Sequence, residues 1–142
     1  MASQIADSHR AGAQVVKGHD ICKKHAMELL EEVGLPRGLL ALSDIEEFGY
    51  NRTSRFMWIV QKKKNEHTFK KIKQTVSYAT EVTAFVETGK MMKVTGVKTK
   101  KLFLWISLVE VYAEESSAGK LTFTTGAGLS ETFDAEAFAL DD

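Results

Sequence analysis

The clearest structural signal in the sequence is VSYATEVTAFVETGKMMKVTGVKTKKLFLWISLVEVY, residues 76–112. Apolar and β-branched residues alternate with polar residues along much of it, and turn residues at Thr88–Lys90 interrupt the alternation. A period of two is typical of strands, because successive side chains of a strand point to opposite faces. The stretch therefore predicts strands joined by short turns. We place them at Val76–Tyr78, Glu81–Thr88, Met91–Val97 and Leu102–Tyr112.

The same period extends to both sides of this stretch. No helical pattern between consecutive strands is long enough for a crossover, so the strands should pair antiparallel. The sequence therefore predicts a mainly β fold in a single domain, either an antiparallel β-barrel or a two-layer sandwich. The further strands are expected at Ile45–Tyr50, Arg55–Gln61, Thr68–Ile72, Lys120–Thr124 and Ser130–Phe133.

One α-helix is predicted near the N-terminus, in DICKKHAMELLEEVGLP, residues 20–36, with Asp20 as its N-cap. Gly34 suits the left-handed cap conformation and Pro36 forbids continuation, so the helix should end there. The residues before Gly18 lack a strong period and are expected to be frayed or weakly helical. We therefore divide the chain into a flexible segment, residues 1–19, and a helix-capped β-barrel domain, residues 20–142. The buried face of the helix should consist of Cys22, Ala26, Leu29, Leu30 and Val33.

Charge is distributed unevenly, although the formal net charge is zero. Residues 62–101 contain eleven lysines and three glutamates, whereas residues 102–142 contain one lysine and eight acidic residues. Either basic and acidic strands lie side by side and neutralise each other, or the lysines gather on a rim that faces a polyanion or an anionic lipid surface. Nucleic acid is disfavoured as a partner. Its single-stranded sites need several exposed aromatic rings among the lysines, and KKKNEHTFKKIK, residues 62–73, contains only Phe69.

The sequence favours a reducing compartment. Cys22 is the only cysteine, so no intramolecular disulfide can form. The first twenty residues contain no apolar run typical of a signal peptide, and no stretch has the length and apolar character of a transmembrane helix. We therefore expect a cytoplasmic protein.

Two predicted strands are apolar on both faces, at residues 56–60 and at Leu102–Tyr112. Either the helix covers the second face, or part of that face lines a cavity for an apolar ligand, as barrels of this size allow. The rings expected to line such a cavity are Phe56, Trp58, Tyr78, Phe85, Phe103 and Trp105. The lysines expected to engage the ligand's carboxylate, or an anionic membrane surface, are Lys62, Lys63, Lys64, Lys70 and Lys71.

No motif that brings a catalytic mechanism with it is present in the sequence. His67 is the candidate general base, with Ser77, Ser107 or a threonine as nucleophile, and a histidine that makes one structural hydrogen bond is the competing interpretation. Neither a metal nor a cofactor is predicted, because the one spacing with metal-ligand residue types lacks a fourth ligand. That spacing joins His19, Cys22 and His25.

Four stretches, taken in order, resemble the plant family called domain of unknown function 538. They are LPRGLLALSDIEEFGYNRTSRFMWI, QKKKNEHTFKKI, VSYATEVTAFVETGKMMKVTGVKTKKLFLWISL and TGAGLSETFDAEAF, and the resemblance extends from about Met27 to the C-terminus. The chain departs from the family pattern at Ala41, where a second proline is usual, at Phe48, where cysteine is frequent, and at Lys101, where an acidic residue often stands. The resemblance implies a small antiparallel β-barrel with helical cover at the N-terminus. It also implies a stress-associated plant protein that binds lipid or chlorophyll or hydrolyses chlorophyll, and it brings no catalytic triad.

Three hypotheses of function follow. The first is a binding module for an amphipathic apolar ligand, a lipid or a chlorophyll derivative. The second is a weak ester hydrolase that uses His67 as base. The third is a regulatory protein-interaction module with a filled core, which would bind partners through its charged faces. The shape of the barrel interior should discriminate among them, because a packed core and an open pocket belong to different classes of protein.

Overall fold

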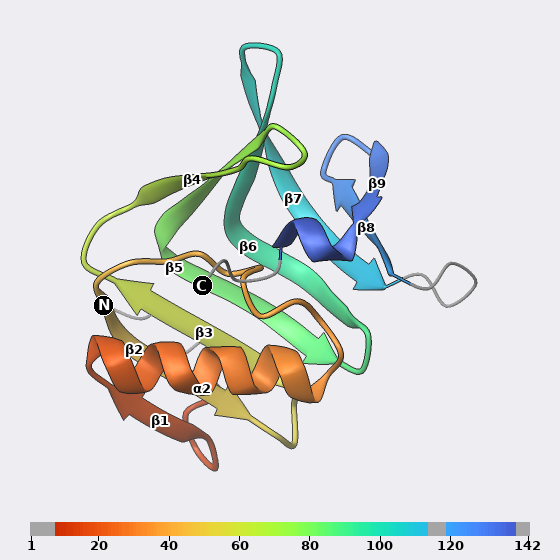
Figure 1. The fold of residues 1–142 in the computed structure, drawn as a ribbon. Coiled ribbons are helices and arrows are strands. Elements are labelled where there is room, and N and C mark those ends of the chain that lie inside the picture. Colours follow the sequence, from red (N-terminus) through yellow and green to blue (C-terminus); the bar gives the residue numbers. More distant parts are fainter. Residues whose placement is uncertain (1–7, 114–118, 139–142) are drawn as a thin grey trace.

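The computed structural model describes residues 8–113 and 119–138, which form one antiparallel sheet of nine strands and one α-helix (Figure 1). The predicted mainly β fold is confirmed. The helix is α2 (His19–Glu32), and a short 3-10 helix, η1 (Ala135–Phe138), follows the last strand. The strands are β1 (Gln14–Lys17), β2 (Ile45–Asn51), β3 (Phe56–Gln61), β4 (Asn65–Phe69), β5 (Gln74–Glu87), β6 (Lys90–Lys101), β7 (Leu104–Ala113), β8 (Lys120–Thr125) and β9 (Ser130–Asp134).

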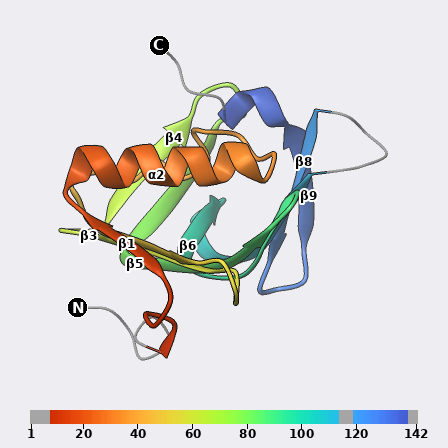
Figure 2. The ribbon, with the colours of Figure 1, turned by 90° about the horizontal axis from the view of Figure 1, so that it is seen from below.

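The strands follow one another through the sheet in the order β1-β2-β3-β5-β6-β7-β8-β9, and β4 also pairs with β5. Every pairing is antiparallel, as expected when short turns connect the strands. Within the described residues β1 and β9 do not pair with each other. The sheet is therefore an open barrel, curved around the core that α2 and η1 cover (Figure 2).

The sheet bends within β5 and β6. The first half of β5 pairs with β4 and its second half with β3, and the register between β5 and β6 shifts between Tyr78 and Thr83. Gly96 of β6 has a φ of 80°, and a Cβ at this position would lie 2.1 Å from the carbonyl oxygen of Glu81. Only glycine permits this approach of two backbones. The prediction of separate strands on either side of residues 79–80 was therefore wrong, since they form one bent strand.

The helix packs as the sequence predicted, and its five expected core residues are all buried. It begins two residues early, with Gly18 in place of Asp20 as N-cap, so Asp20 lies in the first turn, where a carboxylate also stabilises a helix. At the other end the Gly34 N–H donates to the carbonyl of Glu31 at 3.1 Å, and the Leu35 N–H donates to the carbonyl of Leu30 at 2.8 Å. These two bonds form the glycine-terminated cap expected from the sequence. No helix among the described residues has the length and apolar character needed to cross a membrane.

The N-terminal residues, not the helix, cover the outer face of β3. Residues 14–17, expected to be frayed or weakly helical, form β1 and pair with β2. Figure 2 shows the described residues before β1, 8–13, on the side of the sheet opposite α2. The ring of His9 stacks on Phe56 at 4.4 Å between centroids, and the indole of Trp58 donates to the Glu47 carboxylate at 2.7 Å. Phe56 and Trp58 are therefore packed in a small second core.

The expected burial of Leu102–Tyr112 on both faces is wrong at the start of this segment. Leu102 and Phe103 are 90% and 93% exposed, and Leu104 is 67% exposed. They lie at the end of the β6–β7 hairpin, which projects from the body of the sheet (Figure 1). No described segment reaches far enough to cover this end of the hairpin, whereas the later residues Leu108 and Val111 join the main core.

Candidate functional site

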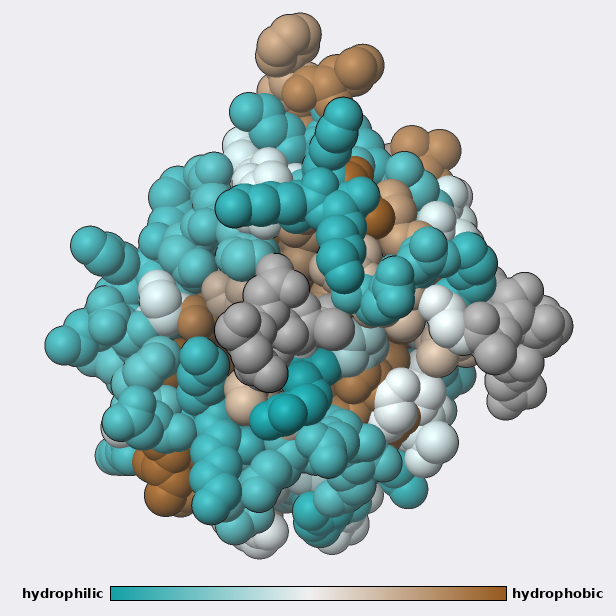
Figure 3. All heavy atoms as spheres, viewed as in Figure 1, coloured by the Kyte–Doolittle hydropathy of each residue, from teal (hydrophilic) through white to brown (hydrophobic). Residues whose placement is uncertain are grey.

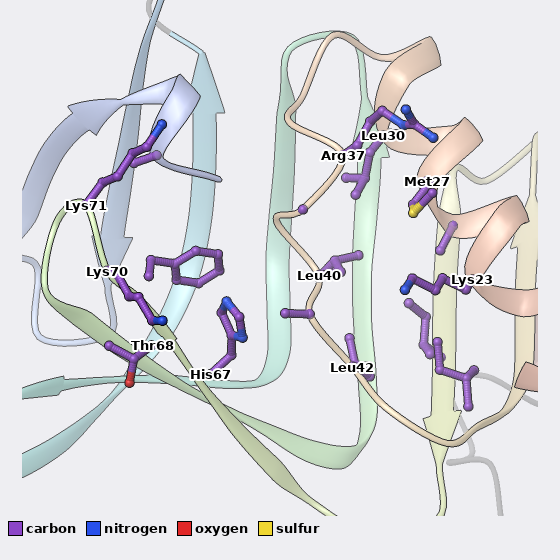
Figure 4. Close-up of a pocket in the computed structure, with 17 residues that line it drawn as sticks. Lys23, Met27, Leu30, Arg37, Leu40, Leu42, His67, Thr68, Lys70 and Lys71 are labelled. Atoms are coloured by element: carbon purple, nitrogen blue, oxygen red, sulfur yellow. The ribbon is translucent and has the colours of Figure 1, made fainter. Parts of the chain in front are cut away.

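A pocket opens on the helix side of the sheet, between α2, residues 37–42 and the β4–β5 hairpin (Figure 4). Its volume is about 430 Å³, within the range of roughly 300–1,000 Å³ that is usual for ligand pockets. By contrast, the hollow lined by Tyr78, Val97 and Phe123 in the main core is about 10 Å³, too small for anything beyond a single water molecule. This part of the barrel interior is therefore filled, and a ligand-sized pocket lies between the helix and the hairpin.

The floor of this pocket is apolar. Leu30 of α2, Ile59 of β3 and Phe69 of β4 line it and are each at most 5% exposed. An apolar group placed on such a surface is removed from water, which stabilises the complex by about 25 cal/mol for each Å² buried. The other apolar lining residues are Ala26, Met27, Leu40, Ala41, Leu42, Ile45 and Ala137.

Buried polar side chains fix the connector, residues 37–43, that forms one wall of the pocket. The Tyr78 hydroxyl donates to the carbonyl of Leu39 at 2.8 Å, and burial raises the pKa of Tyr78, which keeps the hydroxyl protonated as a donor. The side-chain carbonyl of Gln61 accepts from the Ser43 N–H at 3.1 Å, and Gln61 is only 1% exposed. The connector is thus held in place from below. Gln61 was not identified from the sequence, where a glutamine at the end of an apolar strand looks like an ordinary strand terminus.

The rim of the pocket is cationic. Lys23 and Arg37 stand on the helix side and Lys70 and Lys71 on the hairpin side, as Figure 4 shows. Among the described residues, no aspartate or glutamate lines the pocket. Arg37 lies 3.4 Å from a carboxylate oxygen of Glu31, while the three lysines form no ion pair within the described part of the chain. Such a rim favours an anionic group.

The register of the β4–β5 hairpin decides which of its residues reach the pocket. A strand was expected at Thr68–Ile72, but β4 ends at Phe69 and the following residues form the turn. The ring of Phe69 packs against Phe138 of η1 at 4.7 Å between centroids. With Phe69 anchored inside, Lys70 and Lys71 remain exposed at the rim.

The family model described as "Protein of unknown function, DUF538" matches residues 26–139. The chain belongs to the DUF538 family. No curated protein and no solved structure matches it. The matched region contains every lining residue of the pocket except Lys23, so the floor and most of the rim lie within the DUF538 region.

His67, the candidate base, lines the pocket of this DUF538 protein (Figure 4). Its ring contacts Phe69 edge to face at 4.7 Å. Among the described residues, no hydrogen bond joins the ring of His67 to a hydroxyl or a carboxylate. Among the described lining residues, Thr68 is the one with a hydroxyl group, and this hydroxyl is hydrogen-bonded to the hydroxyl of Thr75 at 2.9 Å. Ser77 and Ser107 do not line the pocket.

The six aromatic residues expected to share one cavity are not brought together. Phe56, Trp58 and Phe85 pack in the second core on the outer face. Tyr78 belongs to the main core and supports the pocket wall from below. Phe103 and Trp105 lie on the projecting end of the β6–β7 hairpin. None of the six lines the pocket, and its one aromatic floor residue is Phe69.

The predicted lysines divide into two groups. Lys70 and Lys71 line the pocket, whereas Lys62, Lys63 and Lys64 are exposed in the β3–β4 loop and do not line it. Lys23 and Arg37 complete the rim. They were not identified from the sequence, because no local sequence pattern indicates that a lysine in the helix and an arginine in a loop lie near Lys70.

The residues with metal-ligand spacing serve the packing of the helix in this DUF538 protein. His19 Nδ1 accepts from the Ile45 N–H at 3.1 Å, and the buried Cys22 thiol donates to the Val16 carbonyl at 3.3 Å. Burial raises the pKa of Cys22. No group of three His, Cys, Asp or Glu side chains in the described part of the chain is arranged to hold a metal ion.

Proposed function

We propose that this DUF538 protein binds an amphipathic, anionic ligand in the pocket between α2 and the β4–β5 hairpin. One observation carries the proposal: a pocket of about 430 Å³ has an apolar floor and a rim formed by Lys23, Arg37, Lys70 and Lys71. Among the described residues, no carboxylate lines this pocket. The apolar part of the ligand would rest on Leu30, and its carboxylate or phosphate would meet the lysines.

The volume favours an acyl chain over a complete tetrapyrrole. Since liquid water occupies about 30 Å³ per molecule, the pocket is equivalent to roughly fourteen waters, enough for a ligand of about fifteen non-hydrogen atoms. A medium-length fatty acid is of this size. A chlorophyll derivative would place only its carboxylate-bearing edge inside, with the rest of its ring outside the pocket.

Displacement of a fluorescent fatty acid by dodecanoic acid tests the proposal. Intrinsic tryptophan fluorescence is unsuitable, because Trp58 and Trp105 both lie outside the pocket lining. We expect saturable displacement by dodecanoic acid and much weaker displacement by dodecanol, which has the same chain without the charge. Chlorophyllide, measured in the same assay, distinguishes the two classes of ligand.

Two charge-reversal variants locate the binding site. Lys70→Glu/Lys71→Glu should weaken binding of dodecanoic acid about tenfold, because two exposed ion pairs of about 0.2–1 kcal/mol each are replaced by repulsions of similar size. Lys62→Glu/Lys63→Glu changes the charge of the chain equally at exposed positions outside the pocket and should leave the affinity unchanged. Equal affinities of the two variants, or no saturable binding by the unmodified protein, would refute the proposal.

Ester hydrolysis stays a separate prediction, since His67 borders the same pocket. It predicts turnover of a fatty-acyl ester that His67→Ala abolishes while dodecanoic acid still binds. A location in the cytoplasm and a stress-associated role in a plant, both expected from the sequence, also stay predictions. A fluorescent fusion and a comparison of protein levels before and after stress would test them.

A further inference from the structure

Four consecutive apolar residues, Leu102 to Trp105, form the end of the β6–β7 hairpin, which we call the hairpin tip. Their exposed fractions are 90%, 93%, 67% and 38%. The hairpin projects beyond the rest of the sheet in Figure 1, and Figure 3 shows hydrophobic atoms at its end above a hydrophilic surface. Single exposed apolar residues are ordinary, but a contiguous group on a protrusion is typical of an interaction site.

The tip has no evident role in the fold. Lys101 pairs with Leu104, so Leu102 and Phe103 alone make the turn. Leu102 adopts a φ of 57°, in the left-handed region, where two-residue hairpin turns normally have glycine, asparagine or aspartate. A bulky apolar residue at such a position is unfavourable for the turn itself. Leu102 is therefore unfavourable for the turn, and the described residues of both hydrophobic cores include none of the four tip residues.

Lysines stand directly behind the tip. Lys98 and Lys100 are exposed on β6, and the ammonium of Lys100 lies over the ring of Trp105 at 5.7 Å. Lys101 is held by the Gln74 side chain at 3.0 Å and by the carboxylate of Glu131. The sequence from Thr88 to Val109 contains no aspartate or glutamate. The projecting hairpin is thus apolar at its end and positively charged behind it.

We propose that the hairpin tip inserts into the surface of an anionic lipid bilayer. Strands rise about 3.4 Å per residue, so Lys100 stands about 7 Å behind Leu102. The headgroup layer on each side of a bilayer is about 5–8 Å thick. With Leu102 and Phe103 at the acyl boundary, Lys100 lies among anionic headgroups and Trp105 lies in the interface that tryptophan prefers. Lys98, about 14 Å behind Leu102, lies just outside the headgroup layer, within the Debye length over which the negative surface potential attracts it.

The proposal does not depend on the ligand of the pocket. The two features are nevertheless related in space, because Gln74, which follows the lysine-rich β4–β5 turn, bonds to both Thr99 and Lys101 of β6. Insertion of the tip would bring Lys70 and Lys71 toward the same membrane surface. A ligand released from the bilayer would then have a short path to the pocket rim.

Vesicle flotation with the full chain tests the proposal. We expect binding to phosphatidylcholine vesicles that contain about 30% phosphatidylserine, and at least about tenfold weaker binding to vesicles of phosphatidylcholine alone. Leu102→Ser/Phe103→Ser should reduce binding to the anionic vesicles at least about tenfold, since it removes the two most exposed apolar side chains. Lys98→Glu/Lys100→Glu should reduce it similarly, whereas Lys62→Glu/Lys63→Glu, with the same change of charge, should not. Phospholipids brominated along the acyl chain should quench Trp105, the half-exposed tryptophan, and not Trp58, which is fully buried.

The residues substituted at the tip are exposed, so far-ultraviolet circular dichroism should show an unchanged fold. These substitutions should also leave the displacement of fluorescent fatty acid unchanged. Failure of the pocket proposal would instead appear in the fatty-acid assay alone. The membrane proposal is overturned if the unmodified protein does not float with anionic vesicles, or if Leu102→Ser/Phe103→Ser floats as well as the unmodified protein. It is also overturned if the tip variants turn a dimer into a monomer while vesicle binding is absent, because the tip would then contact a second copy of the chain.

Discussion

Gly49 and Trp58 test whether the outer face of β3 is a packed layer or the wall of a ligand site. They lie directly opposite each other in β2 and β3, and the indole rests on Gly49. A Cβ added to Gly49 would lie 2.2 Å from Cζ2 of Trp58. Ordinary contacts begin near 3.4 Å, so Gly49→Ala requires the ring to move by about 1.2 Å. A fully buried ring has no free space for this movement.

The expected loss of stability follows from two effects. Overpacking of a filled core costs about 1–3 kcal/mol. The displaced indole also weakens its hydrogen bond to the Glu47 carboxylate, 2.7 Å long, and a bond to a charged group contributes about 1.5–3 kcal/mol. Together the change should lower the free energy of unfolding by about 2–5 kcal/mol. For a chain of this size that corresponds to a urea midpoint lower by about 1–2 M.

Urea unfolding followed by circular dichroism measures the effect. Gly126→Ala is the control, because its Cβ would find its nearest neighbour at 3.8 Å, and it should change stability by less than about 0.5 kcal/mol. In a Trp58→Leu background Gly49→Ala should cost less than about 1 kcal/mol, since the clash is gone. If Gly49→Ala and Gly126→Ala unfold at the same urea concentration, the indole is free to move and the outer face is not packed as described.

Three further predictions concern the core. Burial raises the pKa of Tyr78 from an ordinary value of 10.0, so the neutral hydroxyl contributes stability that is present below pH 10 and is lost as the pH rises above it. In urea titrations, the difference in stability between the unmodified protein and Tyr78→Phe should therefore be larger at pH 8 than at pH 11. Because Cys22 is buried and its pKa is raised, a thiol reagent such as Ellman's reagent should react with it in urea but not in the native protein, and rapid native labelling would contradict the helix packing. Gly96→Ala places a Cβ 2.1 Å from the Glu81 carbonyl oxygen at a residue with positive φ, so it should lower the melting temperature by at least about 6 °C. An unchanged melting temperature would show that β5 and β6 do not approach closely at the bend.

The candidate site was only partly predictable from the sequence. Lys70 and Lys71 were identified because a cluster of lysines beside an apolar residue is visible in the sequence, and Phe69 was noted as the one aromatic ring of that cluster. Lys23 and Arg37 were missed because they come from a helix and a connector far from Lys70 in the chain. Whether such residues face one pocket depends on packing between distant segments, which no local period encodes.

The antiparallel strands, the capped end of the helix at Gly34 and Leu35, and membership of the DUF538 family were all predictable from the amino-acid sequence. These features depend on side-chain periods and on residues a few positions apart. What covers each apolar surface, by contrast, could be read only from the folded chain. Trp58 and Phe103 stand in equally apolar stretches, yet the N-terminal segment buries Trp58 and nothing in the described chain reaches Phe103. Burial is a property of the segments that come together, and for this reason the pocket and the exposed hairpin tip became visible only in three dimensions.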